Sequence, residues 1–116
     1  GELRCLDART GERLWETTEL VGQERWGTAF FVQLGGRVFV AAETGELILA
    51  RLTPEGYTEL DRTQLIDPAT RTRGGATGRW GDRGVVWAHP AFANRHIVLR
   101  NDQEIVRISL AAADYD

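Results

Sequence analysis

A few side chains in this sequence are of the types that act as nucleophiles in enzymes. Cys5 is the single cysteine and Ser109 the single serine of the 116 residues. Ser109 lies in an apolar run and lacks the Gly-x-Ser-x-Gly turn that presents a catalytic serine. Cys5 also lies in an apolar run, and no His-bearing segment has a catalytic context, so we expect a buried, unreactive thiol. The sequence therefore predicts no catalytic residue.

Histidines and carboxylates are the remaining candidates for metal binding or acid–base chemistry. His89 and His96 are seven residues apart with no cysteine nearby, whereas a zinc site needs three or four ligands. Glu43, Glu46 and Asp102 fall at the tips of apolar hairpins, a position that indicates turn formation rather than acid–base pairing. We predict no metal-binding and no cofactor-binding residue.

The segment 67–84 is the one stretch whose composition suggests contact with a partner. It holds four arginines and five glycines and is long for a connection between strands. Two interpretations stay open: a solvated insertion, or a loop that grips an acidic or aromatic partner. Its glycines lack the Lys-Ser/Thr of a phosphate-binding loop, so phosphate binding is not expected. Under the second interpretation, the residues expected to contact the partner are Arg71, Arg73, Arg79 and Trp80.

Composition sets the class of protein to which these residues belong. Apolar residues make up 42% of the chain and charged residues 27%, which is typical of a globular protein. The formal net charge of -3 gives no reason to expect a nucleic-acid partner. No stretch approaches the roughly 20 apolar residues of a membrane-spanning helix, so no membrane span is predicted. The chain has no methionine and begins within an apolar run, which favours a fragment of a larger protein.

The elements that must position these side chains are revealed by an internal repeat. Residues 37–52 align without a gap with residues 95–110, at an offset of 58 (95 − 37). Each copy is an apolar run, a short polar turn and a second apolar run. The second run recurs at the start of the chain, where Gly1-Glu2-Leu3 matches Gly45-Glu46-Leu47 at an offset of 44 (45 − 1). Glu2, Glu46 and Glu104 share one slot of this repeat.

These runs predict β-strands joined by hairpins. They are short, rich in Val, Ile, Leu and Phe, and bounded by Gly, Asp, Asn and Thr. Several are almost continuously apolar, as in strands that are covered on both faces. The blade of a β-propeller is such a sheet, because neighbouring blades cover both of its faces. Spacings of 44 and 58 residues also fit the roughly 40–50 residues of a blade, the longer one carrying a loop.

The turn after the first run carries a resemblance to a known family. In Asp7-Ala8-Arg9-Thr10-Gly11, the Asp side chain can accept backbone N–H groups and Gly11 can adopt the positive φ that the turn needs. Together with Trp15, this turn resembles the Ala-x-Asp-x-x-Thr-Gly-x-x-x-Trp repeat of pyrroloquinoline-quinone-like β-propellers, with Cys5 in the Ala slot. The matching residues are Asp7, Thr10, Gly11 and Trp15. Segments 45–52, 86–93 and 100–105 are similar to the C-terminal blades of bacterial proteins with this repeat.

The resemblance implies a fold and a division of the chain. We expect an all-β partial β-propeller of about two and a half four-stranded antiparallel blades, forming one domain over residues 1–116. Residues 1–16 would end one blade, 17–66 would form a second, and 67–116 would form a third, C-terminal blade with the long loop 67–84. In the family the Trp packs between adjacent blades and the Thr-Gly turn hydrogen-bonds to it. A second turn, at 53–56, is expected to use Gly56 at positive φ and to place Leu60 where the first copy has Trp15.

Two functions follow from the resemblance. The first is a non-catalytic propeller scaffold that binds an unknown protein partner and the remaining blades of its parent. The alternative is part of a quinoprotein oxidoreductase that holds pyrroloquinoline quinone and Ca²⁺ in other blades. That enzyme class uses an adjacent cysteine pair, which this chain lacks. By the same resemblance we expect a periplasmic or other extracytoplasmic location.

Overall fold

A computed structural model describes residues 1–24, 26–72 and 82–112 of the chain. The prediction of an all-β fold is confirmed, since the described residues form small antiparallel sheets and no α-helix. Strands β1 (Leu3–Leu6) and β2 (Arg13–Thr17) form the N-terminal hairpin. The central sheet contains β3 (Ala29–Leu34), β4 (Arg37–Ala42), β5 (Glu46–Thr53) and β6 (Gly56–Gln64). The C-terminal sheet contains β9 (Ala91–Ala93), β10 (His96–Arg100) and β11 (Ile105–Ser109). A short pair joins β7 (Thr70–Arg71) to β8 (Gly84–Val85).

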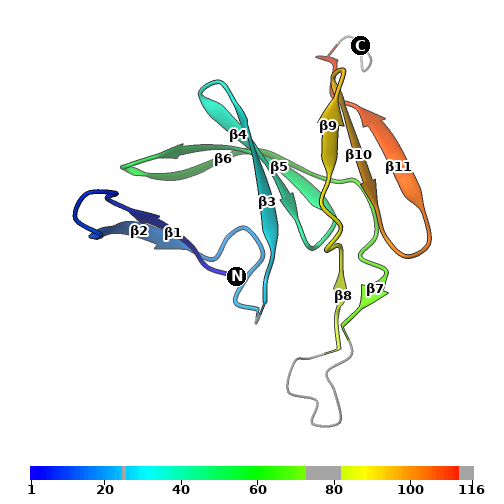
Figure 1. The fold of residues 1–116 in the computed structure, drawn as a ribbon, viewed down its shortest axis with the longest axis horizontal. Coiled ribbons are helices and arrows are strands. Elements are labelled where there is room, and N and C mark those ends of the chain that lie inside the picture. Colours follow the sequence, from blue (N-terminus) through cyan, green and yellow to red (C-terminus); the bar gives the residue numbers. More distant parts are fainter. Residues whose placement is uncertain (25, 73–81, 113–116) are drawn as a thin grey trace.

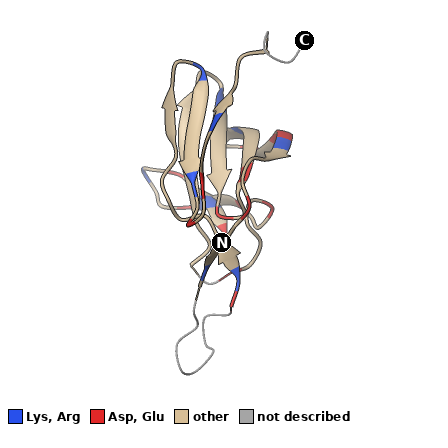
Figure 2. Ribbon diagram, turned by 90° about the vertical axis from the view of Figure 1, so that its right-hand side faces the viewer, with Lys and Arg blue, Asp and Glu red and all other residues tan. Residues whose placement is uncertain are grey.

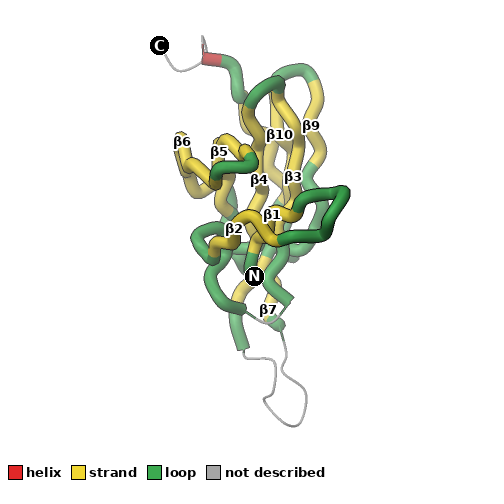
Figure 3. The backbone as a smooth tube through the Cα atoms, turned by 90° about the vertical axis from the view of Figure 1, so that its left-hand side faces the viewer, coloured by secondary structure: helices red, strands yellow, loops and turns green. Residues whose placement is uncertain are grey.

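The central sheet is a simple meander in which each strand pairs with the next along the chain. Its order is β3-β4-β5-β6, and Figure 3 shows these strands side by side. The turn between β4 and β5 depends on Gly45, which has a φ of 84°. A Cβ there would also lie 1.9 Å from the Ile66 carbonyl oxygen. Glycine is therefore required at this turn, both for its backbone conformation and for the close approach of the chain.

The hairpins β1–β2 and β5–β6 share a β-bulge at equivalent positions. The register shifts between Cys5 and Leu6 in the first hairpin and between Leu49 and Ala50 in the second, 44 residues later. The extra residues are Leu14 and Leu60, because Cys5 pairs with Trp15 and Leu49 pairs with Asp61. The expectation that Leu60 occupies the place of Trp15 is therefore wrong.

The turn between β5 and β6 also differs from the expectation. Thr53 pairs directly with Gly56, which leaves Pro54 and Glu55 as a two-residue loop. Gly56 is absent from the positive-φ glycines, so it begins a strand instead of supplying a left-handed position. In the first hairpin Gly11 does adopt the expected positive φ, at 74°.

The hairpin β10–β11 repeats β4–β5 with a turn that is one residue shorter. Ile48 pairs with Val40 in the central sheet, and Val106 pairs with Leu99 in the C-terminal sheet. Val106 follows Ile48 by 58 residues, whereas Leu99 follows Val40 by 59 (99 − 40). The ungapped alignment is therefore correct for the second strand and wrong by one residue for the first.

Two apolar clusters join the three sheets. One face of the central sheet buries Val40, Ile48 and Ala50 completely, and Leu3 and Leu20 from the N-terminal segment pack against them. Its other face contributes Leu47 and Phe39 to a second cluster with the C-terminal sheet. Figure 1 shows the N-terminal hairpin on one side of the central sheet and the C-terminal sheet on the other. The sheets are therefore stacked in chain order.

Every strand of the C-terminal sheet contributes residues to the second cluster. Ile97 is fully buried, and Leu99, Val106 and Ile108 lie with it on the face that points to the central sheet. Phe39 of β4 stacks on Phe92 of β9, with ring centroids 5.7 Å apart. Burying side chains of this size provides about 1.5–3 kcal/mol each, so the cluster is the main connection between the two sheets.

The molecule is flat and open. Its extents are 43 × 41 × 20 Å and its radius of gyration is 15.6 Å, whereas a compact domain of this length has a radius of about 13 Å. No closed barrel or ring of sheets forms within the described ranges. Basic and acidic residues are interspersed along the ribbon in Figure 2. No helix in the described part of the chain is long and apolar enough to cross a membrane.

Candidate functional site

The turn predicted from Asp7, Thr10 and Gly11 is built as expected. One oxygen of Asp7 accepts hydrogen bonds from the backbone N–H groups of Arg9 (2.8 Å) and Thr10 (3.0 Å). Both bonds lower the pKa of Asp7 because they favour its charged form. The bond from Thr10 has the larger effect, followed by the bond from Arg9. The Thr10 hydroxyl accepts a hydrogen bond from the Glu12 N–H. The turn is therefore stabilised by its own side chains.

Trp15 links this turn to the next sheet. Its indole N–H donates a 2.8 Å hydrogen bond to the carbonyl oxygen of Thr53, the last residue of β5. Thr53 belongs to the hairpin that repeats β1–β2, so the bond joins one copy of the repeat to the next. The resemblance implied a hydrogen bond between the tryptophan and a Thr-Gly turn, and in the structure the indole N–H binds the Thr53 carbonyl oxygen of the neighbouring copy.

The arginine-rich segment is only partly described. Arg71 donates to the carboxylate and to the carbonyl oxygen of Asp82, at 3.1 and 3.0 Å, across the β7–β8 pair. Its guanidinium therefore closes the base of the segment. Arg73, Arg79 and Trp80 lie outside the described residues.

A buried carboxylate that sequence reasoning assigned to a turn connects two sheets. The Glu43 side chain is 3% exposed. One of its oxygens accepts two hydrogen bonds from the Arg83 guanidinium (3.1 and 2.9 Å), and the other accepts from the Thr28 N–H (3.1 Å) and the Trp87 indole (2.8 Å). Its backbone accepts a further bond from Val86. Because Arg83 is 40 residues away, no local spacing could have revealed this pair.

A second network ties β6 to the segment that follows β2. Arg62 donates to Glu46 (2.9 Å), to both oxygens of Glu59 (2.9 and 2.8 Å) and to the Glu19 carbonyl oxygen (2.8 Å). The Tyr57 hydroxyl donates to Glu59 at 2.7 Å. The repeat identified Glu46 as a recurrent position, but it did not identify the partner Arg62, which lies on the neighbouring strand β6.

The same network moves the pKa values of its members. Hydrogen bonds from Arg62 and then Tyr57 lower the pKa of Glu59 to about 2. Burial, followed by the bond to Glu59, raises the pKa of Tyr57 above its usual value. The hydrogen bond to Glu59 raises the pKa of Arg62 still further. All three groups are thereby held in the charge states they have near neutral pH, which suits a structural connection rather than proton transfer.

The remaining chemical candidates are dispersed. Cys5 is half-buried beside Trp15 on β2, so the thiol is less buried than the sequence predicted. His89 packs against Phe30, with ring centroids 4.5 Å apart, and His96 is turned to the carbonyl oxygen of Asn94. Within residues 1–24, 26–72 and 82–112, no three His, Cys, Asp or Glu side chains are grouped so that they could hold a metal ion.

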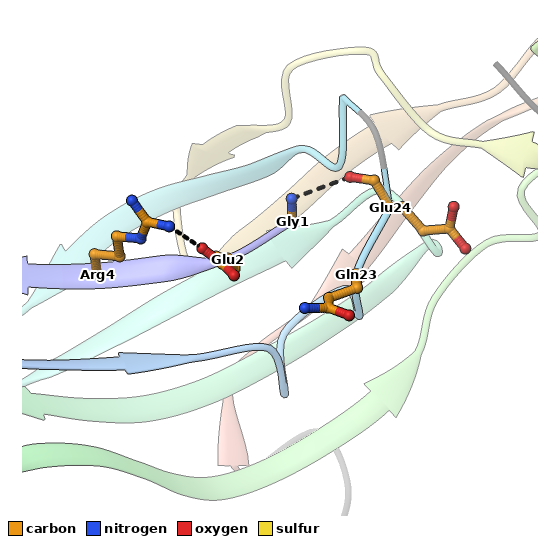
Figure 4. Close-up of a pocket in the computed structure, with 5 residues that line it drawn as sticks. All are labelled: Gly1, Glu2, Arg4, Gln23 and Glu24. Carbon is orange, nitrogen blue, oxygen red and sulfur yellow. Dashed lines mark hydrogen bonds and ion pairs between the residues drawn. The ribbon is translucent and has the colours of Figure 1, made fainter. Parts of the chain in front are cut away.

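Two surface hollows are candidate binding places. The first, of about 450 Å³, lies at the start of the chain between residues 1–4 and 23–24. In Figure 4, Glu2 and Arg4 point toward each other and form an ion pair, while the Glu24 side chain points away from them. The Gly1 amino group donates to the Glu24 carbonyl oxygen at 3.1 Å. These contacts leave a shallow polar hollow without convergent groups.

The second hollow is a cleft between the central and C-terminal sheets. It has a volume of about 860 Å³ and is more apolar than the first. Its lining includes Phe39, Leu47 and Asp61 on one side and Ile108 and Leu110 on the other. The cleft is thus bounded by β6 and by the end of β11, the edge strand of the C-terminal sheet.

No family model, no curated protein and no solved structure matches this chain.

Proposed function

We propose that this chain is part of a β-propeller that acts as a non-catalytic scaffold for another protein. The observation that carries the proposal is the repeated stacking of similar sheets in chain order. The N-terminal hairpin, the central sheet and the C-terminal sheet each turn an equivalent face to the sheet before or after them. In a propeller, four-stranded meanders pack face to face in the same way about a common centre.

The contacts between copies support this interpretation. The Trp15–Thr53 bond runs from one copy of the repeat to the next. The buried Glu43 carboxylate, in the segment 17–66, likewise binds Arg83 and Trp87 of the segment 67–116. Under this proposal residues 17–66 are one blade, 67–116 are three strands of another, and residues 1–16 complete a third.

Solution scattering tests the architecture. The stacked, open arrangement predicts a radius of gyration near 15.6 Å for the monomeric chain. A value near about 13 Å, as for a closed compact domain of this length, would contradict the stacking.

A quinone titration tests the role. We expect no saturable change in the absorbance of pyrroloquinoline quinone when the longest protein containing this chain is added with Ca²⁺. Saturable binding together with dye-linked dehydrogenase activity would favour an oxidoreductase and overturn the scaffold proposal.

A further inference from the structure

Asp61 takes the place of Trp15 in the next copy of the repeat. Cys5 pairs with Trp15 in the first hairpin, and Leu49, which follows Cys5 by 44 residues, pairs with Asp61. Residues that pair directly across antiparallel strands share one face of the sheet. Phe39 pairs with Leu49 in the same row and belongs to the cluster between the central and C-terminal sheets. Asp61 therefore faces the C-terminal sheet, as Trp15 faces the central one.

The aspartate removes two features that the tryptophan supplies to its interface. The Trp15 side chain is half-buried, and its indole N–H donates to the Thr53 carbonyl oxygen at 2.8 Å. The Asp61 side chain is much smaller, and a charged carboxylate accepts hydrogen bonds but donates none. The interface between the central and C-terminal sheets therefore lacks a ring and a donor where the preceding interface has both.

The cleft of about 860 Å³ lies at this point of the second interface. Asp61 and Phe39 line it from the central sheet, and Leu110 lines it from the end of the C-terminal sheet. Leu110 follows Leu52 by 58 residues, and Leu52 directly precedes the residue that accepts the Trp15 bond. The cleft therefore corresponds to the place of the tryptophan ring. Its volume lies within the range of about 300–1,000 Å³ that is typical of small-molecule sites.

The Asp61 carboxylate is available for a positively charged group. One of its oxygens accepts the Arg62 backbone N–H at 2.8 Å, and no cation pairs with it among the described residues. The guanidinium of Arg62, which also lines the cleft, is paired with Glu46 and Glu59. Arg37 lines the cleft from β4, and β5 lies between that strand and β6. A cation on the β6 side would therefore meet a carboxylate that no ion pair neutralises.

We propose that this cleft binds a small aromatic amine. Its ring takes the place that the Trp15 ring has in the preceding interface and contacts the apolar lining, which includes Phe39 and Leu47. Its ammonium group supplies the absent donor and pairs with Asp61, since charge-assisted hydrogen bonds are stronger than neutral ones. The inference goes beyond the proposed scaffold function and rests only on the stacked arrangement of the sheets.

Tryptamine, an indole that carries an ammonium group, is the probe. In an NMR titration of the full chain we expect saturable shifts of the Phe39, Asp61 and Leu110 amides. Indole-3-acetate has the same ring with a carboxylate and should bind at least about tenfold more weakly. Asp61→Asn should weaken tryptamine binding about tenfold and remove the preference between the two ligands. Asp102→Asn, in the turn between β10 and β11, is the matched control and should change neither affinity.

Asp61→Trp tests the equivalence of the two interfaces. A tryptophan at this position should fill the cleft as Trp15 fills its own interface. Tryptamine should then bind at least about tenfold more weakly, while the melting temperature stays the same or rises. Leu60→Trp is the matched control, because it adds the same ring at an exposed bulge position that does not line the cleft. It should leave tryptamine binding unchanged.

Three results would overturn the proposal. Equal or tighter binding of indole-3-acetate would show that Asp61 does not select the charge of the ligand. Unchanged tryptamine binding by both Asp61 variants would place the ligand elsewhere. Tryptamine that binds this chain but not the longest protein containing it would show that other protein segments cover the cleft. If tryptamine fails to bind while the scattering radius is as expected, only this inference fails and the stacked scaffold stands.

Discussion

Glu43 combines a buried position with four hydrogen-bond donors from three parts of the chain. Its carboxylate binds the Thr28 backbone before β3, the Arg83 guanidinium before β8 and the Trp87 indole. A buried acid stays charged at low cost only when such donors replace water. In the described residues every buried side-chain nitrogen or oxygen has a partner. Glu43 thus fixes the segment around β8, which leads into the C-terminal sheet, to the end of β4.

Glu43→Gln should be strongly destabilising even though the side chain keeps its size. The amide NH₂ of the glutamine would face one of the N–H donors that now bind the carboxylate, so a hydrogen bond would be lost. The Arg83 guanidinium would also lose its counter-charge. We expect a loss of about 2–3 kcal/mol in the free energy of unfolding, measured by urea denaturation. Glu55→Gln, on the exposed turn between β5 and β6, is the control and should change stability by less than about 0.5 kcal/mol. Equal midpoints for the two variants would contradict a structural role for Glu43.

Glu59 makes the stability of the chain depend on pH in the acidic range. Its folded-state pKa is lowered from 4.5 to about 2, chiefly by Arg62. A lowered folded pKa means that the charged form stabilises the fold. This contribution is complete above pH 4.5 and is lost as the pH falls towards 2.

The Glu59→Gln variant isolates that contribution. Because the pair lies near the surface, we expect it to provide less than about 1 kcal/mol, and less at high salt. The difference in melting temperature between the original chain and Glu59→Gln should therefore shrink as the pH is lowered from 5 to 2. A difference that stays constant over this range would show that Glu59 does not act through its charge.

At the scale of elements, the hairpins are connected by specific contacts as well as by apolar burial. Trp15→Phe keeps an aromatic ring on β2 but removes the hydrogen bond to Thr53. We expect a loss of about 1 kcal/mol and faster hydrogen exchange in β1 and β2, measured by NMR. Leu14→Ala, at the exposed bulge position beside it, should leave the exchange of β1 and β2 almost unchanged. Unaltered exchange in Trp15→Phe would mean that apolar packing alone holds the hairpin.

The elements also show what the sequence could and could not predict. Apolar runs placed the hairpins within 37–52 and 95–110, because burial on both faces leaves a continuous apolar pattern. The bulges at Leu14 and Leu60 were missed, since a bulge changes strand pairing without a signal in composition. The one-residue difference in the β10–β11 turn was missed for the same reason. Glu43 and Arg83 could not be paired, because their contact depends on how two sheets stack.

At the scale of the whole molecule, the central sheet supports both of its neighbours. Its two faces belong to different clusters, with Ile48 in the first and Leu47 in the second. The N-terminal hairpin and the C-terminal sheet meet the rest of the chain mainly through these clusters. Stacked units that contact only their neighbours have stabilities close to a sum of unit and interface terms. A destabilising substitution in a terminal sheet should therefore affect mainly that sheet, whereas one in the central sheet should destabilise all three.

Two substitutions of fully buried isoleucines test this difference. Ile97 and Ile48 are both 0% exposed, and truncation to alanine costs about 2–5 kcal/mol at such sites. Ile97→Ala should speed hydrogen exchange throughout β9–β11 and leave β1 and β2 protected, because Ile97 contributes only to the second cluster. Ile48→Ala should reduce protection in all three sheets, because the central sheet is their common support. If Ile97→Ala reduced the protection of β1 as much as that of β10, the chain would unfold as a single cooperative unit, and the stack of semi-independent sheets would be the wrong description.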